Sequence, residues 1–467
     1  KSPIRSTYLI KAADFLACHS QSYITRYDMI HEIKDGGTFL LNTSWTEEEL
    51  TEKLPGDVKQ YIARHNVQFY IVDANRLARE LGLGNHANMI LQAAFFKLSG
   101  VMPVEDAVRH MKEAVQKTYA KKGEKVVNMN MAAVDAGINS PVKVNVPADW
   151  ANAADDRTVD ETLPDVVKNI VVPCNRQRGD DLPVSAFLPY QDGTYPLGTS
   201  KYDKRGIAAF LPQWDSNKCL QCNQCTFVCP HAAIRPVLLT EEEKKSVPAG
   251  FETVPAKGLG KDSPYSFRMQ VSPYDCLGCG VCLTASCAAS CLSKDKALTM
   301  QPVDDTMYDE TNWNYALSLK DKPGVFDRKT LKGSQFSQPL VEFSGACAGC
   351  GETPYAKLIT QLYGEKTYWV NGVGCSLAWA GAFPSLPYTK NKEGRGPAFY
   401  GTLFEDQAEN GLGVVLATKQ RRAYVKQVAQ QLLPLVPGTE LEGAIHAWLA
   451  SFDDLDANDA DARKLTA

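Results

Sequence analysis

The sequence predicts an α/β protein of several domains: a doubly wound α/β domain, a small linking module, a cysteine-rich α+β module and a further α/β segment. The 467 residues are too many for one core, since a domain usually holds roughly 100 to 200 residues. Short apolar strands alternate with helical stretches over the first third of the chain, and nine cysteines gather in two bursts near its middle. We expect these parts at residues 1–150, 151–210, 211–302 and 303–467.

The first part carries the strand and helix alternation. Short apolar runs bounded by turn or polar residues predict buried strands at 14–18, 38–42 and 68–72. Helices are predicted at 27–33, 46–54, 58–66 and 74–100. Gly82 and Gly84 are expected to interrupt the last helix, because the third glycine of a dinucleotide loop is missing. This alternation favours a parallel sheet with helices on both faces.

Composition excludes several functions. The net charge of -4, with acidic and basic residues interleaved, argues against binding to nucleic acid. No apolar run reaches the roughly 18 residues of a membrane helix. The 14 cysteines are too sparse for a disulfide scaffold and suit metal in a reducing compartment, so we expect a cytoplasmic protein. Cys18 and Cys174 lie outside any metal spacing and should simply pack.

The first cysteine burst contains Cys219, Cys222, Cys225 and Cys229 followed by proline, the spacing C-x2-C-x2-C-x3-C-P. In two-cluster ferredoxins, three of these thiolates hold one [4Fe-4S] cube and the fourth reaches the other cube. A zinc site would instead use two separated pairs, often with histidine. The burst therefore predicts an electron carrier. His231, two residues after the last cysteine, is expected to be an ordinary hydrogen-bonding side chain.

The second burst departs from this spacing and leaves two interpretations. In the first, Cys276, Cys279 and Cys282 bind the second cube with Cys229, and Cys291 joins the first cube. In the other, Cys287 replaces Cys282 as the third ligand, because Cys287-x3-Cys291 reproduces the usual spacing between the third and fourth ligands. We favour the first, since the loop Cys276–Cys282 is intact.

A third set consists of Cys347, Cys350 and Cys375, one cysteine short of a cube. On spacing alone, Cys347 and Cys350 could also form a redox dithiol or an incomplete zinc site.

Together these segments resemble the single-chain pyruvate:ferredoxin (or flavodoxin) oxidoreductases. The matching segments include residues 34–39, 179–185, 196–199, 221–225 and 347–355, and the similarity covers practically the whole chain. One departure is Asp203-Lys204-Arg205, where the family usually has Glu-Lys-Arg. The chain starts with lysine, so we expect an internal fragment of a longer enzyme.

The resemblance implies a function and its cofactors. Cys347, Cys350 and Cys375 would hold a proximal [4Fe-4S] cluster beside thiamine diphosphate, with a fourth ligand beyond residue 467 and Glu352 on the thiamine side. Residues 1–150 would be the latter part of a gamma-type domain associated with coenzyme A, and residues 303–467 would begin the thiamine-diphosphate-binding domain. The intact enzyme would be a homodimer that converts pyruvate and coenzyme A to acetyl-CoA and carbon dioxide, with three clusters passing electrons to ferredoxin or flavodoxin.

One absence limits this implication. No Gly-Asp-Gly followed by an asparagine-rich segment occurs, so the oxygen ligands of a Mg²⁺-diphosphate site are expected elsewhere. The chain alone is therefore not expected to decarboxylate pyruvate. The alternative hypothesis is a stand-alone electron-transfer module with two [4Fe-4S] cubes that serves another enzyme.

Overall fold

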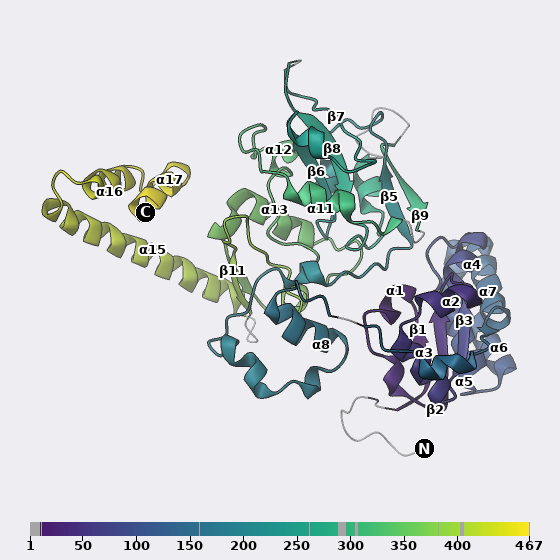
Figure 1. Cartoon of the computed structure of the whole chain (residues 1–467). Coiled ribbons are helices and arrows are strands. Elements are labelled where there is room, and N and C mark those ends of the chain that lie inside the picture. Colours follow the sequence, from purple (N-terminus) through teal and green to yellow (C-terminus); the bar gives the residue numbers. More distant parts are fainter. Residues whose placement is uncertain are drawn as a thin grey trace. The chain divides into compact units, whose positions relative to one another are not determined.

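The structure is a computed structural model, shown in Figure 1. It describes residues 10, 12–157, 159–260, 262–287, 296–303, 307–381, 383–401 and 406–466, without the side chains of 285–287 and 455–456. The chain divides into two compact units, one of residues 1–367 and 378–397 and the other of 368–377 and 398–467. Among the described helices, none combines the length and the apolarity that a membrane crossing requires.

A four-stranded sheet organises the amino-terminal part of the first unit. Its strands follow one another in the order β1 (Ala13–Cys18), β2 (Ile33–Asn42), β3 (Gln68–Val72) and β4 (Val142–Lys143). The first three strands are parallel, with Cys18 beside Leu41 and Thr38 beside Gln68, whereas β4 pairs antiparallel to β3. The parallel strands and intervening helices confirm an α/β fold. The described strands run in sequential order, without the reversal that creates a switch point in a doubly wound sheet.

Helices cover both faces of this sheet, as the purple and blue part of Figure 1 shows. The helices are α1 (Gln21–Ile24), α2 (Glu47–Lys53), α3 (Gly56–Arg64), α4 (Ala74–Glu80), α5 (Asn88–Ser99), α6 (Val104–Tyr119) and α7 (Glu124–Asn139). One core places Leu40 and Val72 against α4 to α7. The other places Phe39 and Leu41 against α2 and α3. Successive residues of β2 thus enter opposite cores, as the alternation of side chains along a strand requires.

Most predicted elements of this part occur where the sequence placed them. The prediction of β3 is correct at both ends, and the capping box of Thr46 and Glu49 begins α2. The helix predicted at 74–100 is two helices, separated where Gly82 and Gly84 have positive φ. The helix predicted at 27–33 is wrong: only Ile30–Glu32 forms a short 3-10 turn, because Ile33 already begins β2. Cys18 packs in the core, as expected.

Residues 148–202 form short turns rather than long elements. These are η3 (Ala148–Asn152), η4 (Val167–Val171), α8 (Val172–Asn175), η5 (Gly179–Asp181), η6 (Val184–Tyr190) and η7 (Thr199–Tyr202). The segment after η3 wraps α3 so closely that a Cβ on Gly56 would lie 1.6 Å from the carbonyl oxygen of Ala154. Only glycine fits at that position.

The cysteine-rich part is built from antiparallel strands with short helices between them. Its elements are β5 (Phe210–Trp214), α9 (Gln224–Phe227), β6 (Ile234–Leu239), η8 (Glu243–Ser246), β7 (Val254–Pro255), β8 (Ser266–Val271), η9 (Cys282–Cys287) and β9 (Leu298–Pro302). Strand β5 pairs with β9, and β8 lies between β6 and β7. Phe267 and Met269 of β8 are buried beneath Cys219 and Cys282. The cysteine loops therefore rest on a small, closed apolar core.

The rest of the first unit has short helices joined by irregular segments. It contains α11 (Thr311–Ser318), α12 (Leu331–Ser334), α13 (Thr353–Tyr363) and the 3-10 turn η11 (Gly364–Lys366).

The second unit pairs β10 (Tyr368–Asn371) with β11 (Ala398–Gly401) in parallel. It continues through α15 (Gln407–Leu432), η12 (Leu433–Leu435), α16 (Glu440–Ala450) and α17 (Leu455–Thr466), with Ala429, Ile445 and Trp448 at their common core. Helix α14 (Cys375–Ala380) starts in the second unit and ends in the first.

Candidate iron-sulfur centres

Four thiols from two separate segments line one cavity. Cys229 follows α9, Cys276 and Cys279 lie on the loop after β8, and Cys282 begins η9. Pro230 and Ile234 close other sides of the cavity. The last cysteine of the first motif thus lies with the first three of the second, which is the donor set and arrangement that a [4Fe-4S] cube takes in two-cluster ferredoxins.

The loop that carries Cys276 and Cys279 depends on a glycine between them. Gly278 has φ +66°, and a Cβ there would lie 2.8 Å from the carbonyl oxygen of Phe210. Its amide nitrogen faces the Cys276 sulfur at 3.5 Å. An amide directed at a cysteine sulfur stabilises negative charge on that sulfur, which is one of the factors that set cluster potentials.

The first motif forms a similar loop. Gln221 has a positive φ of 59°, and its amide nitrogen lies 3.4 Å from the Cys219 sulfur. Cys219 is buried, while Cys222 and Cys225 are partly buried. Burial raises the pKa of Cys225 well above its usual range, and the nearby Cys282, Cys219 and Cys222 thiols raise it further. Three thiols of the first motif therefore lie close together.

The fourth position beside these three is outside the described residues. Cys291 falls in the undescribed segment, and of Cys287 only the backbone at the end of η9 is described. Cys282, in contrast, is 9% exposed and lies in the cavity with Cys229. The structure thus places the Cys282 side chain with the second motif and gives no position for the Cys287 side chain.

Burial governs the ionisation of the second-motif thiols. Burial raises the pKa of Cys282 to about 12, with the neighbouring Cys229 and Cys279 thiols adding to the increase. The pKa of Cys276 is raised for the same two reasons. These thiols are therefore protonated near neutral pH in the metal-free chain. Binding of iron must release their protons, as metal binding by thiolates generally does.

A lysine that the sequence did not single out lies beside both motifs. Lys357, on α13, is 2% exposed, and its ammonium group donates hydrogen bonds to the carbonyl oxygens of Thr226, Phe227 (3.2 Å) and Cys229 (3.1 Å). It adds a charged donor to backbone acceptors at and just after the end of α9, where the helix leaves carbonyl groups without partners of its own. Burial lowers the pKa of Lys357 to about 8, partly opposed by the nearby Cys229 thiol.

The Cys347 and Cys350 pair forms one tight turn, in which the amide of Cys350 donates to the carbonyl of Cys347 at 3.0 Å. The amide of Glu352 lies 3.4 Å from the Cys350 sulfur, and the exposed Glu352 carboxylate accepts a hydrogen bond from Trp379 at 3.1 Å. Cys375 is exposed at the start of α14 and belongs to the second unit. Of the third cysteine set, the first unit therefore contains a preformed pair.

Two contacts connect this turn to the second ferredoxin motif. His231 follows Cys229 by two residues and is buried. Its Nε2 lies 3.3 Å from the carbonyl oxygen of Cys347. Burial lowers the pKa of His231 to about 4, so the imidazole is neutral. A Cβ on Gly349, whose φ is +79°, would lie 3.8 Å from Cys279, which shows how closely the two loops pack. The expected hydrogen-bonding role of His231 is confirmed, although the sequence did not indicate that its partner is the Cys347 carbonyl.

Known proteins match the chain over nearly its whole length. Residues 1–140 match the family described as "Pyruvate ferredoxin/flavodoxin oxidoreductase", residues 153–208 a "Domain of unknown function" and residues 211–234 a "4Fe-4S binding domain". The chain is 50% identical, over 97% of its length, to the pyruvate-flavodoxin oxidoreductase of Enterobacter agglomerans. It is 47% identical, over 98% of its length, to the pyruvate:ferredoxin oxidoreductase of Moorella thermoacetica. The chain belongs to the pyruvate:ferredoxin/flavodoxin oxidoreductase family.

Its relatives in this family are considerably longer. The chain spans 38% of the length of both the Enterobacter and the Moorella proteins. It is also 45% identical over 97% of its length to the mitochondrial pyruvate dehydrogenase [NADP(+)] of Euglena gracilis, of which it spans 25%. Relatives with differently named electron acceptors thus share the segment that carries the cysteine motifs.

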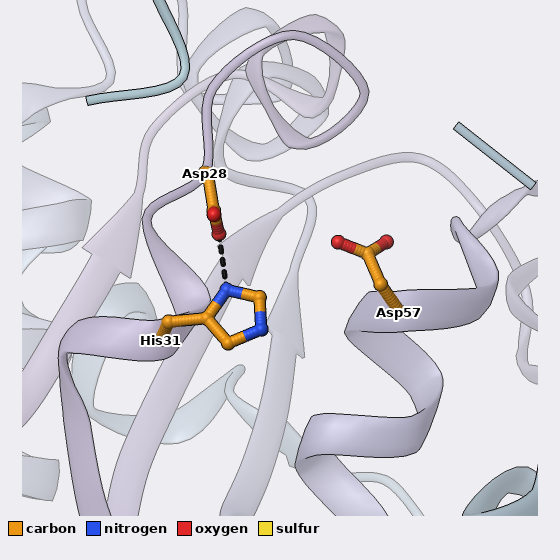
Figure 2. A group of neighbouring side chains, drawn as sticks. All are labelled: Asp28, His31 and Asp57. Atoms are coloured by element: carbon orange, nitrogen blue, oxygen red, sulfur yellow. Dashed lines mark hydrogen bonds and ion pairs between the residues drawn. The ribbon is translucent and has the colours of Figure 1, made fainter. Parts of the chain in front are cut away.

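One further group of ligand-type side chains lies outside the cysteine motifs. Figure 2 shows Asp28 and His31 facing each other, with Asp57 opposite them at the start of α3. Two arginines from the linking module pair with the carboxylates: Arg178 lies 3.2 Å from Asp28, and Arg157 lies 2.9 Å from Asp57. Burial alone would raise the pKa of Asp28, but His31 and the arginines more than offset this and hold it low. The two carboxylates of this group are therefore engaged in ion pairs with the linking module.

Proposed function

We propose that this chain is the electron-relay segment of an enzyme that oxidatively decarboxylates pyruvate. The observation that carries the proposal is the cavity lined by Cys229, Cys276, Cys279 and Cys282, to which both cysteine motifs contribute. Chance placement of buried thiols would not reproduce the crossed ligand pattern of two-cluster ferredoxins. The relatives' names supply pyruvate as the substrate.

The proposed ligands form three sets. One cube is held by Cys219, Cys222, Cys225 and Cys291, and the next by Cys229, Cys276, Cys279 and Cys282. The proximal cluster is held by Cys347, Cys350, Cys375 and a further ligand. When bound, [4Fe-4S] clusters carry one electron each at potentials set by charge, sulfur hydrogen bonds and exposure. The buried position of Cys282 in the cavity with Cys229 supports Cys282 as the third ligand of the second motif.

The chain's own residues position these sets. The packing of Gly349 on Cys279 and the contact of His231 with Cys347 bring the proximal pair next to the second motif. Lys357 joins α13 to the end of the first motif. We therefore propose that electrons enter from the Cys347 side, reach the second motif and leave by the first.

The proposed exit is the loop that begins at Cys219. Leu220 is 48% exposed there, and the Lys257 ammonium group lies 2.7 Å from the carbonyl oxygen of Cys219. The Lys332 ammonium group bonds in turn to the carbonyl of Lys257. An exposed apolar side chain flanked by cations suits a small acidic electron carrier, since complementary charge speeds docking. A flavodoxin or a ferredoxin is the proposed partner.

The remaining parts would serve the enzyme's other steps. We propose that residues 1–150 belong to the coenzyme A-associated domain, that 151–210 link it to the cubes at 211–302, and that 303–467 begin a domain for thiamine diphosphate and Mg²⁺. Thiamine diphosphate would supply the carbanion chemistry that releases carbon dioxide. Glu352 would lie on its side of the proximal cluster. The intact enzyme is proposed to be a cytoplasmic homodimer.

Anaerobic reconstitution of the chain with iron and sulfide tests this proposal. We expect about eight irons per chain in the ferredoxin-like part, and a spin-coupled pair of clusters by EPR after reduction. Recovery of four irons or fewer after repeated reconstitution would exclude two cubes.

A further inference from the structure

The segment that matches a domain of unknown function, residues 153–208, makes a set of contacts that gives it a role. We propose that Asp203-Lys204-Arg205 is a clamp that fixes the Cys347–Cys350 turn against the second ferredoxin motif. The inference rests on the proposed function in one respect: it assumes that these two loops hold adjacent redox centres.

Lys204 anchors one side of the clamp. Its ammonium group lies 2.8 Å from Asp275 and 2.9 Å from Glu310. The Asp275 side chain is only 1% exposed and also accepts a hydrogen bond from Ser272 at 2.6 Å. Because Asp275 directly precedes Cys276, Lys204 holds the start of the second motif.

Arg205 anchors the other side. Its guanidinium donates to the carbonyl oxygens of Ser344 at 2.8 Å and Phe343 at 3.3 Å, and it is itself oriented by Asp203 at 3.3 Å. These two carbonyls lie three and four residues before Cys347. A planar guanidinium can serve both at once, which a lysine ammonium does less well. Lys204 thus binds the residue just before the second ferredoxin motif, and the adjacent Arg205 binds the backbone just before Cys347.

The rest of the segment gives this clamp a firm base. Ser200 is fully buried and donates to the carbonyl of Glu342 at 2.9 Å, and the amide of Leu386 donates to the Thr199 hydroxyl at 2.7 Å. At its other end, the segment is tied to the amino-terminal domain by the buried pair of Arg157 and Asp57. A segment without long helices or strands is therefore held at both ends.

The geometry that the clamp maintains is the packing of Gly349 on Cys279. The Gly349 amide donates a hydrogen bond to the Cys279 sulfur, and a Cβ on Gly349 would lie 3.5 Å from the Val281 side chain and 3.8 Å from that of Cys279. A loop free to move would weaken this hydrogen bond, and loss of a hydrogen bond to a ligand sulfur disfavours the reduced, more negative cluster. The clamp is thus expected to set the potential of the second cube as well as its distance from the proximal turn.

Arg205→Gln in the full 467-residue chain tests the clamp. We expect the iron content to stay near eight, while at a fixed potential the ratio of reduced to oxidised second cube falls about tenfold, about 59 mV for a one-electron couple. Deuterium exchange at the Phe343 amide, which donates to the carbonyl of His231 at 3.0 Å, should become at least about tenfold faster. Lys201→Gln is the matched control, because it removes an exposed cation from the same segment and should change neither quantity.

Unchanged potential and unchanged exchange in Arg205→Gln would overturn the clamp. If Arg205→Gln loses iron, Arg205→Lys becomes the test of the clamp. Lysine keeps the positive charge but cannot bond to the Phe343 and Ser344 carbonyls with one planar group. Wild-type potential and exchange in that variant would equally overturn the proposal. If the wild-type chain itself binds four irons or fewer, the proposed function fails, and exchange at Phe343 in the metal-free chain still tests the clamp by itself.

Discussion

Replacing Cys282 with serine separates the two ligand assignments for the second motif. Cys282 is 9% exposed and lines the same cavity as Cys229, Cys276 and Cys279. Serine is similar in size but lacks the thiolate that iron requires, so the cavity would keep its shape and lose one of its four sulfur donors. The change removes a ligand without creating a large void.

The expected change in iron content follows from the number of thiols left in the cavity. With three sulfurs left, the second cube should fail to assemble or be lost on gel filtration, and iron should fall from about eight to about four per chain. The spin coupling between cubes should disappear from the EPR spectrum of the reduced protein. Cys174→Ser is the matched control, because Cys174 is a partly buried thiol that lies outside every cysteine motif. It should keep the full iron content.

Cys287→Ser completes the comparison, since it alters the competing ligand and keeps the four thiols that line the cavity, Cys229, Cys276, Cys279 and Cys282. We expect it to retain about eight irons and the coupled signal. Full iron content in Cys282→Ser, together with loss of half the iron in Cys287→Ser, would show that the enlarged loop is the correct assignment.

Three further predictions concern the Arg157–Asp57 ion pair, the loop around Gly278 and the proposed electron exit. Arg157→Met leaves Asp57 unpaired where the two side chains are 7% and 16% exposed, so the segment that wraps α3 should lose about 3 to 5 kcal/mol at neutral pH, measured by hydrogen exchange. Burial already raises the pKa of Asp57 above 3.8, and without the arginine it rises further; folded protein then binds the proton more tightly than unfolded, so the deficit should shrink as the pH falls towards 3.8. Gly278→Ala places a Cβ in a left-handed conformation that costs about 1 to 2 kcal/mol, and the iron content should fall towards four; full occupancy would mean that the loop adapts. The double substitution Lys257→Gln and Lys332→Gln should slow the reduction of a flavodoxin about tenfold at low salt in stopped-flow measurements. An unchanged rate would show that electrons do not leave the chain near Cys219.

The sequence predicted the elements and ligands whose evidence is local. Strand β3 was correct at both ends because a short apolar run between turns reflects its burial. The 27–33 helix failed because the pairing of β2 with β1 extends to Ile33, a long-range interaction that local periodicity does not contain. The spacing of the first cysteine burst predicted iron-sulfur chemistry, and residues 211–234 match a 4Fe-4S binding domain.

The positioning residues could not be predicted because their partners are distant in sequence. Lys357 bonds to carbonyls 128 to 131 residues away, and a buried lysine resembles a surface lysine in a sequence. The one available signal was its place between Ala356 and Thr360 on the buried face of α13. His231 likewise meets Cys347 only through the fold.

Coulometric reduction of the reconstituted chain tests the central claim most directly. Each [4Fe-4S] cube accepts one electron, so the ferredoxin-like part should take up two electrons per chain. Both electrons should then pass to an added flavodoxin. Uptake of one electron or none by a sample containing about eight irons would contradict the claim that both motifs hold redox-active clusters that transfer electrons.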